Sequence, residues 1–193
     1  MGAGNEEIDA VRLETDRLIL RDVVPGDVDG FHAYMADPAY IRHLPLDPID
    51  RVEVQAMVDR VLLRQGPGPR GRYFLAAVER GSGRLIGEAI FKRLSDVEGE
   101  IGWAVAGPDQ RQGLATEIGR ALANFGFGDL RLHRLIARSE IGNHASERIM
   151  AKLGMVREGV LREHLFARGR WWASAQWSML ASDPHPPAPA KCG

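Results

Sequence analysis

The sequence contains a single cysteine, Cys192, which stands next to the last residue. One cysteine cannot form an intrachain disulfide or a cysteine-based metal cluster. No apolar run approaches the roughly twenty residues that a membrane-spanning helix requires. Residues 1–10 combine glycines with acidic side chains and lack the apolar block of a secretion signal. These absences exclude a disulfide-stabilised scaffold, and we expect a cytoplasmic protein with no membrane partner.

The chain also lacks an excess of charge of either sign. Its 25 Lys and Arg residues are balanced by 26 Asp and Glu residues, which gives a formal net charge of −1 at pH 7. Because binding of nucleic acid depends on an excess of basic side chains, we expect no nucleic-acid partner. The six histidines, at positions 32, 43, 133, 144, 164 and 185, show no i,i+4 pair, so we expect no metal site.

The length favours one domain. With 193 residues, of which 45% are hydrophobic, the chain can fill one core but is short for two. We predict a flexible N-terminus over residues 1–10, where hydrophobic periodicity is absent, and a single domain over residues 11–182. Residues 183–193 are rich in proline and are predicted to form a disordered tail.

Hydrophobic periodicity predicts alternating strands and helices, as in an α/β protein. Strands are predicted at 17–21, 73–78, 85–91, 100–106, 134–138, 156–166 and 171–180, and helices around 28–35, 51–62, 114–125 and 143–153. Glycines at 81–83 predict a hairpin between two of the strands, whereas glycines and prolines exclude regular structure at 65–72. The strand at 134–138 follows a helix, so we expect it to run parallel to the strand at 100–106.

Residues 110–117 (QRQGLATE) lie between a predicted strand and an amphipathic helix. Gly113 and Ala115 have little or no side chain, so a ligand can approach the main chain. The first N–H groups of the helix have no intrahelical partner, and the helix dipole adds about half a positive charge there. We interpret this loop as a cradle for a diphosphate; the alternative is a turn without a ligand.

Four motifs occur in order along the chain: EIGW at 100–103, QxxGxA at 110–115, NHAS at 143–146 and KLGM at 152–155. Together they resemble the GNAT superfamily of acyl-CoA-dependent N-acyltransferases, in particular its RimJ/RimL-like branch of ribosomal-protein N-terminal acetyltransferases. The likeness extends from residue 13 to residue 180. It implies an α/β GNAT fold, in which a central mixed and largely antiparallel sheet is splayed in a V and flanked by helices on both faces. It also implies that residues 40–47 help to wall the acceptor pocket.

The resemblance implies acetyl-CoA as the acyl donor and no metal. The residues expected to contact acetyl-CoA are Val105, Arg111, Gln112, Gly113, Leu114, Ala115, Thr116 and Asn143. Backbone groups near Val105 are expected to bind the pantetheine and the thioester oxygen, because fixed dipoles stabilise the charge that develops there. Gly102, which has no side chain, and Ala104, which has only a methyl group, leave room for the donor.

Two side chains are candidates for catalysis. Glu100 occupies the strand position that holds a catalytic Glu in some members of the superfamily, so we expect it to act as the general base, directly or through a water. The alternative is a solvated carboxylate at a strand end. Ser146 matches the Asn-x-x-Ser pattern of the branch and is expected to protonate or hydrogen-bond the leaving thiolate. The alternative is that Ser146 only closes the first turn of a helix that Asn143 caps.

Trp171 and Trp172 follow Arg170 in the last predicted strand, and alternation places the two rings on opposite faces of the sheet. One ring is therefore expected to belong to the core. The branch often has Asp after this aromatic pair, whereas this chain has Ala173. That difference weakens any acceptor assignment that depends on a carboxylate at this position.

We therefore predict an acyl-CoA-dependent N-acyltransferase, with acetyl-CoA as donor, that acts on a primary amine by a direct ternary-complex mechanism. The direct route is expected because the chain has no suitable thiol for an acyl-enzyme. The predicted acceptor is the N-terminal α-amine of a protein or peptide. The alternatives are a small-molecule amine, such as an amino acid, polyamine or antibiotic, and a non-catalytic acyl-CoA-binding regulatory module. The expected state is a monomer or homodimer.

Overall fold

The computed structural model describes residues 10–47, 49–66, 68 and 70–184. One eight-stranded sheet has the order β1-β2-β3-β4-β5-β6-β8-β7. Its strands are Arg12–Glu14 (β1), Leu18–Asp22 (β2), Arg72–Glu79 (β3), Leu85–Arg93 (β4), Glu98–Val105 (β5), Arg134–Glu140 (β6), Val156–Ala167 (β7) and Arg170–Leu180 (β8). Residues 1–9 of the predicted flexible N-terminus and residues 185–193 of the predicted tail, including Cys192, lie outside the described residues.

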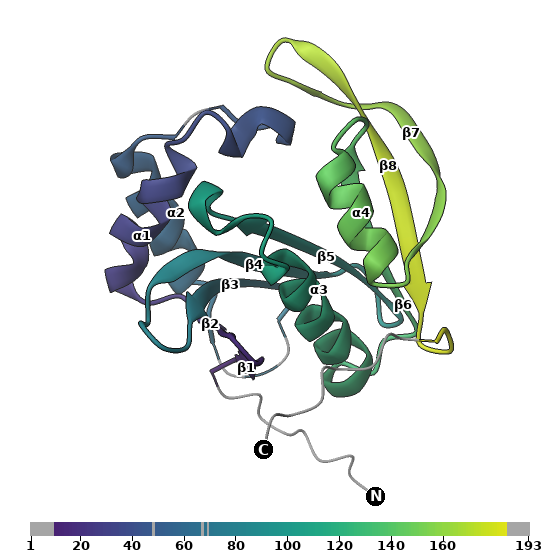
Figure 1. Ribbon diagram of the computed structural model, residues 1–193, viewed down its shortest axis with the longest axis horizontal. Coiled ribbons are helices and arrows are strands. Elements are labelled where there is room, and N and C mark those ends of the chain that lie inside the picture. Colours follow the sequence, from purple (N-terminus) through teal and green to yellow (C-terminus); the bar gives the residue numbers. More distant parts are fainter. Residues whose placement is uncertain (1–9, 48, 67, 69, 185–193) are drawn as a thin grey trace, which may run out of the picture.

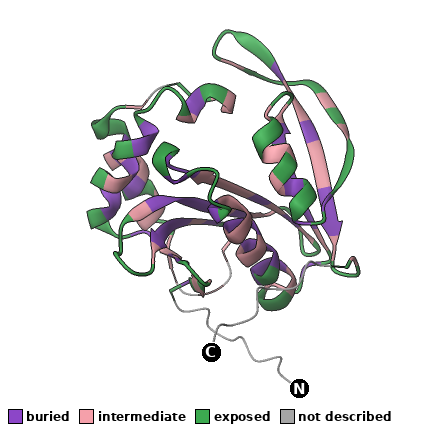
Figure 2. Cartoon of the chain, in the orientation of Figure 1, coloured by how far each residue is buried: buried purple, intermediate pink, exposed green. Residues whose placement is uncertain are grey.

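Helices cover both faces of the sheet (Figure 1). The α-helices are Val28–Met35 (α1), Arg51–Leu62 (α2), Leu114–Asn124 (α3) and His144–Lys152 (α4), and shorter helical segments are Pro25–Asp27 (η1), Tyr40–His43 (η2), Gly107–Asp109 (η3) and Phe125–Asp129 (η4). One core packs α3 and α4 against residues such as Leu20, Phe91 and Ile101. A second core packs α1 and α2 against Ala76 and Val78 on the opposite face. Figure 2 shows that burial is concentrated where these helices meet the central strands.

The sheet separates between its two parallel strands, β5 and β6, and we call the place where they part the split. β5 and β6 pair only from Glu98 to Glu100, opposite Arg134 to Ile136, although both strands continue for several residues. Every other neighbouring pair of strands is antiparallel. The predicted fold, a mixed and largely antiparallel sheet splayed in a V with helices on both faces, is therefore confirmed.

Most predicted elements are found close to their expected positions. Asp50 caps α2, because its side chain accepts from the Glu53 N–H at 2.9 Å, and Asn143 precedes α4 as predicted. The sequence reading missed β1, a three-residue strand without a clear apolar alternation, which pairs with β2. The helix after the cradle also continues into the π-helical segment η4, where the sequence reading placed its end.

Candidate active site

The predicted cradle has a backbone suited to an anion. Arg111 and Gly113 both adopt left-handed conformations, with φ of 63° and 82°. Gly113 is the N-cap of α3. In the described part of the chain, the backbone N–H groups of residues 111–115 donate no hydrogen bond. Successive free N–H groups at a helix start form a concave anion site, and the positive φ of a non-glycine residue is a strain of the kind found at functional sites.

The predicted cradle residues contribute in different ways. Leu114 is buried, so only its backbone N–H faces the loop. The Thr116 N–H donates to the Gly113 carbonyl at 3.1 Å and is not free. Arg111 and Gln112 are exposed. The backbone N–H groups of residues 111–115 and the exposed side chain of Arg111 are therefore available for a ligand.

A clamp that the sequence did not reveal holds this loop. Arg17 Nη1 donates to the Gln112 carbonyl at 2.9 Å, and Arg17 Nη2 lies 2.7 Å from Glu117 Oε2. The Thr15 hydroxyl also donates to Glu117. Burial raises the pKa of Glu117, but the hydrogen bonds from Thr15 and Arg17 outweigh it and leave the pKa below its ordinary value. The β1–β2 connection thus fixes the start of α3.

The register of β5 shows which backbone groups face the split. The Ala106 N–H donates to the Ile86 carbonyl, and the Leu94 N–H donates to the Glu98 carbonyl. The even-numbered residues of β5 therefore form their backbone hydrogen bonds with β4. Odd-numbered residues, including Trp103 and Val105, therefore point their N–H and C=O groups toward β6, beyond the last paired residue.

Val105, a predicted site residue, has one of its two backbone polar groups, the N–H, free at the split. Its carbonyl accepts from the Gln110 side-chain amide at 3.0 Å. Its N–H lies beyond the paired part of β5 and β6 and donates no hydrogen bond within the described chain. The Val105 N–H therefore remains available, whereas its carbonyl already ties the cradle to the end of β5.

Glu100 is the last residue of β5 that pairs with β6, at the point where the strands separate. Its side chain is 17% exposed and lies between two cations, with Oε2 3.5 Å from Lys92 Nζ and 3.6 Å from Arg138 Nη1. The carboxylate is thus at the predicted place, but it is engaged rather than free. A base role requires the acceptor amine to compete with Lys92 and Arg138 for it.

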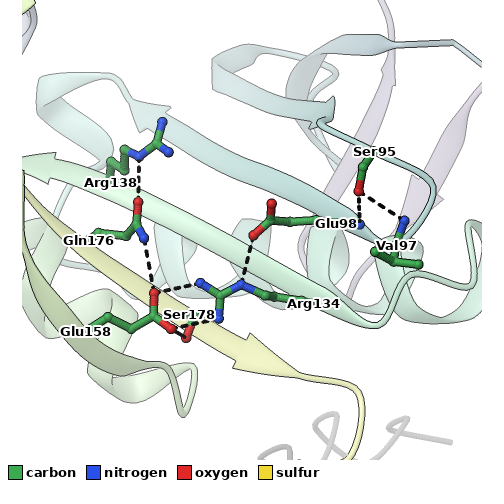
Figure 3. Close-up of polar contacts among 8 residues, drawn as sticks. All are labelled: Ser95, Val97, Glu98, Arg134, Arg138, Glu158, Gln176 and Ser178. Atoms are coloured by element: carbon green, nitrogen blue, oxygen red, sulfur yellow. Dashed lines mark hydrogen bonds and ion pairs between the residues drawn. The ribbon is translucent and has the colours of Figure 1, made fainter. Parts of the chain in front are cut away.

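Arg138, which contacts Glu100, belongs to a polar network that Figure 3 shows. Arg138 Nε donates to Gln176 Oε1 at 3.0 Å, and Gln176 Nε2 donates to Glu158 Oε2 at 3.1 Å. Arg134 binds Glu158 through two hydrogen bonds of 2.7 and 2.6 Å. These hydrogen bonds lower the pKa of Glu158 to about 2. The network therefore links β6, β8 and β7 beside the split.

Asn143 and Ser146 begin α4, which follows the carboxyl end of β6. Asn143 Oδ1 accepts from the Ser146 N–H at 3.2 Å, so the predicted helix cap is confirmed. The Ser146 hydroxyl makes no hydrogen bond within the described residues and is half-buried. Because β5 and β6 are parallel, the starts of α3 and α4 lie at the same edge of the sheet. The structure thus brings the cradle and the Asn143–Ser146 pair to one edge.

Glu88 was missed by the sequence reading. It is 4% exposed, on β4 opposite Ala104, and accepts hydrogen bonds from the Tyr34 hydroxyl at 2.8 Å and the Tyr40 hydroxyl at 3.0 Å. Burial raises its pKa, against the opposing effect of these hydrogen bonds. A charged residue inside the apolar run LIGEAIF was the available signal. Glu88 anchors η2, within the segment 40–47 that was expected to wall the acceptor pocket.

The two tryptophans lie as predicted. Trp172 is 3% exposed and belongs to the core, whereas Trp171 is 57% exposed. Arg170 stacks on Trp172, with its guanidinium carbon 3.6 Å from the ring centroid. The aromatic pair therefore provides one core side chain and one surface side chain, and the core one supports Arg170.

The arrangement fits a CoA thioester. The free N–H groups of residues 111–115 suit a diphosphate, and the unpaired edge of β5 suits the amide groups of pantetheine. The Ser139 hydroxyl, on β6 beyond its last pair with β5, is buried without a hydrogen-bond partner in the described chain. Among residues 10–47, 49–66, 68 and 70–184, no group of three or more metal-binding side chains is present, and no helix is long and apolar enough to cross a membrane.

Known proteins resemble this chain in sequence and in fold. The family model described as Acetyltransferase (GNAT) domain matches residues 17–156. Two Bacillus subtilis (strain 168) proteins, named Uncharacterized N-acetyltransferase YnaD and YoaA, are 27% and 30% identical to the chain. The matches cover 90% of this chain and 99% of YnaD, and 87% of this chain and 96% of YoaA.

Solved structures give the same result. A GNAT-family acetyltransferase from Bacillus anthracis superposes with a TM-score of 0.80 at 25% identity, over 90% of this chain and all of that one (100%). The family match spans most of the predicted domain and includes the cradle, Glu100 and Asn143. The chain therefore belongs to the GNAT family of acetyltransferases.

Proposed function

We propose that this N-acetyltransferase transfers an acetyl group from acetyl-CoA to the N-terminal α-amine of a protein or peptide, in a direct ternary complex. The observation that carries the donor assignment is the run of free N–H groups at residues 111–115, beside the unpaired edge of β5. Val105, residues 111–116 and Asn143 are proposed to hold the donor. Acetyl-CoA, when bound, supplies a thioester whose C–S bond breaks as the new amide bond forms.

The described side chains are assigned two proton-handling tasks. Glu100 is proposed to take the proton that the acceptor amine loses, directly or through one water, because its carboxylate lies where β5 and β6 separate. Ser146 is proposed to supply a hydrogen bond to the leaving sulfur, because its hydroxyl, at the start of α4, binds no other described residue. Cys192 is the only thiol in the sequence that could carry the acetyl group as an acyl-enzyme thioester, so a direct transfer is favoured.

The choice of an α-amine rests on the cost of removing its proton. At pH 7, neutralising an α-amine with a pKa of about 7.8 costs about 1 kcal/mol, against about 4.6 kcal/mol for a lysine amine with a pKa of about 10.4. A lysine acceptor would need a strong base, whereas Glu100 is engaged by Lys92 and Arg138. An α-amine makes the smaller demand on this site.

Proteins with this fold are named for different acceptors. The ribosomal-protein-S5-alanine acetyltransferase from Vibrio fischeri has a TM-score of 0.70 at 19% identity. The spermidine N-acetyltransferase from Vibrio cholerae, solved with CoA and spermine, has a TM-score of 0.72 at 19% identity. At these identities the likeness concerns the fold alone. A RimJ/RimL-like protein acceptor is therefore proposed from the sequence motifs and the cost of amine deprotonation.

A matched pair of peptides tests the proposal. One peptide has a free N-terminus and no lysine, and the other has a blocked N-terminus and one lysine. Thiol release from acetyl-CoA is measured at pH 7 with each peptide, with spermine and with free amino acids. We expect the peptide with the free N-terminus to react fastest, with mass spectrometry locating the acetyl group on its α-amine.

The other results identify the alternatives. Faster acetylation of the blocked peptide contradicts the α-amine assignment. Turnover with spermine or amino acids alone indicates a small-molecule acceptor. Binding of acetyl-CoA without thiol release for any amine contradicts a catalytic role with these acceptor classes.

A further inference from the structure

A pocket of about 460 Å³ lies between the segment after α1 and the turn of the β7–β8 hairpin. It is lined by Pro38, Ala39, Arg42, Arg168 and Arg170. In Figure 1 the hairpin turn projects beyond the rest of the sheet. Arg168 joins the two sides, because its Nη1 donates to the Ile41 carbonyl at 3.0 Å. The pocket is thus formed by segments that are far apart in the sequence.

The lining of this pocket is cationic. Arg42 and Arg168 form no ion pair with any described residue, and Arg170 pairs with Glu140 at 2.7 Å. Glu140 is shared with His43, whose Nδ1 lies 2.8 Å from Oε2. Three guanidinium groups are therefore accompanied by one ion-paired carboxylate. Guanidinium groups bind carboxylates and phosphates through paired hydrogen bonds, so the pocket suits an anionic group.

The pocket is held in place from both sides. On the hairpin side, Arg170 lies over the Trp172 ring at 3.6 Å, and Trp172 is core. On the other side, Tyr40 precedes Arg42 in η2 and donates to the buried Glu88. A site whose cations are supported in this way loses less side-chain entropy when it binds a ligand.

The position of Glu140 relates the pocket to the split. Ile136 pairs with Glu100, and Glu140 lies four residues further along β6, or about 13 Å at about 3.3 Å per residue. Arg138 and Glu140 point to the same face as Glu100, because side chains alternate along a strand and Arg138 contacts Glu100. An extended peptide with its amine at Glu100 would reach the pocket with roughly its third to fifth residue.

We propose that this pocket selects acceptors that carry an acidic group, a carboxylate or a phosphate, at about the third to fifth residue from the reacting N-terminus. The inference rests on the proposed peptide acceptor. It adds a specificity determinant made of Arg42, Arg168 and Arg170. Free amino acids and short amines cannot span the distance from Glu100 to these side chains.

Peptides that differ at two positions test the inference. Three peptides share one lysine-free sequence with a free N-terminus and differ only at residues 4 and 5. These two residues are Asp-Asp, Asn-Asn or Lys-Lys. A fourth peptide has phosphoserine at residue 4, and a fifth has Asp-Asp at residues 9 and 10, beyond reach. We expect kcat/KM for Asp-Asp at residues 4 and 5 to exceed that for Asn-Asn by roughly fivefold, mainly through KM, and the ratio to fall as salt is added. A gain with phosphoserine identifies phosphate as an accepted anion.

Variants assign the effect to the pocket. Arg42→Gln should reduce the Asp-Asp to Asn-Asn ratio, and Arg42→Glu should favour Lys-Lys. Arg60→Gln, at an exposed arginine on α2 that forms no ion pair within the described chain, should leave every ratio unchanged. Equal kcat/KM for the Asp-Asp and Asn-Asn peptides would overturn the inference and leave the proposed function standing. Failure to acetylate any peptide would contradict both.

Discussion

Gly113 combines a left-handed backbone and a free N–H with the absence of a side chain over the cradle. Its φ of 82° is left-handed, and its N–H belongs to the free run of the cradle. An L-residue in this conformation costs about 1–2 kcal/mol, and a large side chain would also stand over the donors. Among the described residues, a Cβ at this position would meet only Arg17 Nη2, at 3.6 Å, so the change costs backbone strain and causes no clash at Cβ.

We therefore predict that Gly113→Trp weakens acetyl-CoA binding by about tenfold or more while the protein remains folded, because a bulky group blocks approach to the backbone. Calorimetry measures the affinity, and circular dichroism checks the fold. Gly83→Trp, at another left-handed glycine (φ 70°) with open space around it, is the matched control. Unchanged affinity in folded Gly113→Trp would exclude the cradle as the donor site.

Glu100 should affect the rate more than donor binding. Its carboxylate lies at the point of strand separation, away from the cradle, so Glu100→Gln should lower kcat and leave the Kd for acetyl-CoA near its wild-type value. Steady-state rates from pH 6 to 9 measure the effect. Asp96→Asn, whose side chain is 99% exposed, serves as a control. Wild-type kcat/KM at every pH in Glu100→Gln would mean that the base lies elsewhere.

At the scale of elements, two variants at the start of α4 distinguish a structural role from a chemical one. Asn143→Ala removes the cap on the Ser146 N–H and should lower the free energy of unfolding by about 1 kcal/mol. Ser146→Ala keeps that backbone bond, so it should slow turnover without a comparable loss of stability. Thermal unfolding and kcat, measured on both variants, test the difference. Equal and small effects on both quantities would leave Ser146 with a structural role only.

The strands beside the split should unfold more easily in acid. Arg134, with further hydrogen bonds from Ser178 and Gln176, lowers the pKa of Glu158 from its ordinary 4.5 to about 2. Because the folded pKa is the lower one, the contribution of this pair is complete above pH 4.5 and is lost as the pH falls toward 2. Between pH 5 and pH 2, the free energy of unfolding should therefore fall less in Glu158→Gln than in the wild-type protein.

Urea unfolding at a series of pH values measures this dependence. Arg134→Gln removes the other partner of the same pair, so it should reduce the slope in the same way, and the double variant should add little. An unchanged slope in Glu158→Gln would show that the network contributes nothing to acid sensitivity.

For the whole molecule, the prediction concerns the order of chemical events. Cys192 is the only cysteine, and the donor cradle and Glu100 belong to one split in one sheet. Initial rates at varied acetyl-CoA and peptide should therefore give intersecting double-reciprocal lines, as a ternary complex requires, and Cys192→Ser should retain wild-type turnover. Parallel lines, or loss of activity in Cys192→Ser, would indicate an acyl-enzyme instead.

The sequence by itself determined the order of strands and helices, the position of the cradle between β5 and α3, and the Asn143 cap. These features depend on periodicity and on contacts within a few residues, which a sequence displays directly. The short strand β1 escaped because three residues carry too little periodicity, and its pairing with β2 is what stabilises it.

Tertiary structure alone decided which side chains meet at the site. The Arg17 clamp on the cradle, the Tyr34 and Tyr40 hydrogen bonds to Glu88, and the contact of Arg168 with Ile41 join residues separated by 48 to 127 positions. The engagement of Glu100 by Arg138 likewise requires the parallel pairing of β5 and β6. Such contacts follow from strand register and helix packing, and the residue types and their spacing along the chain leave both undetermined.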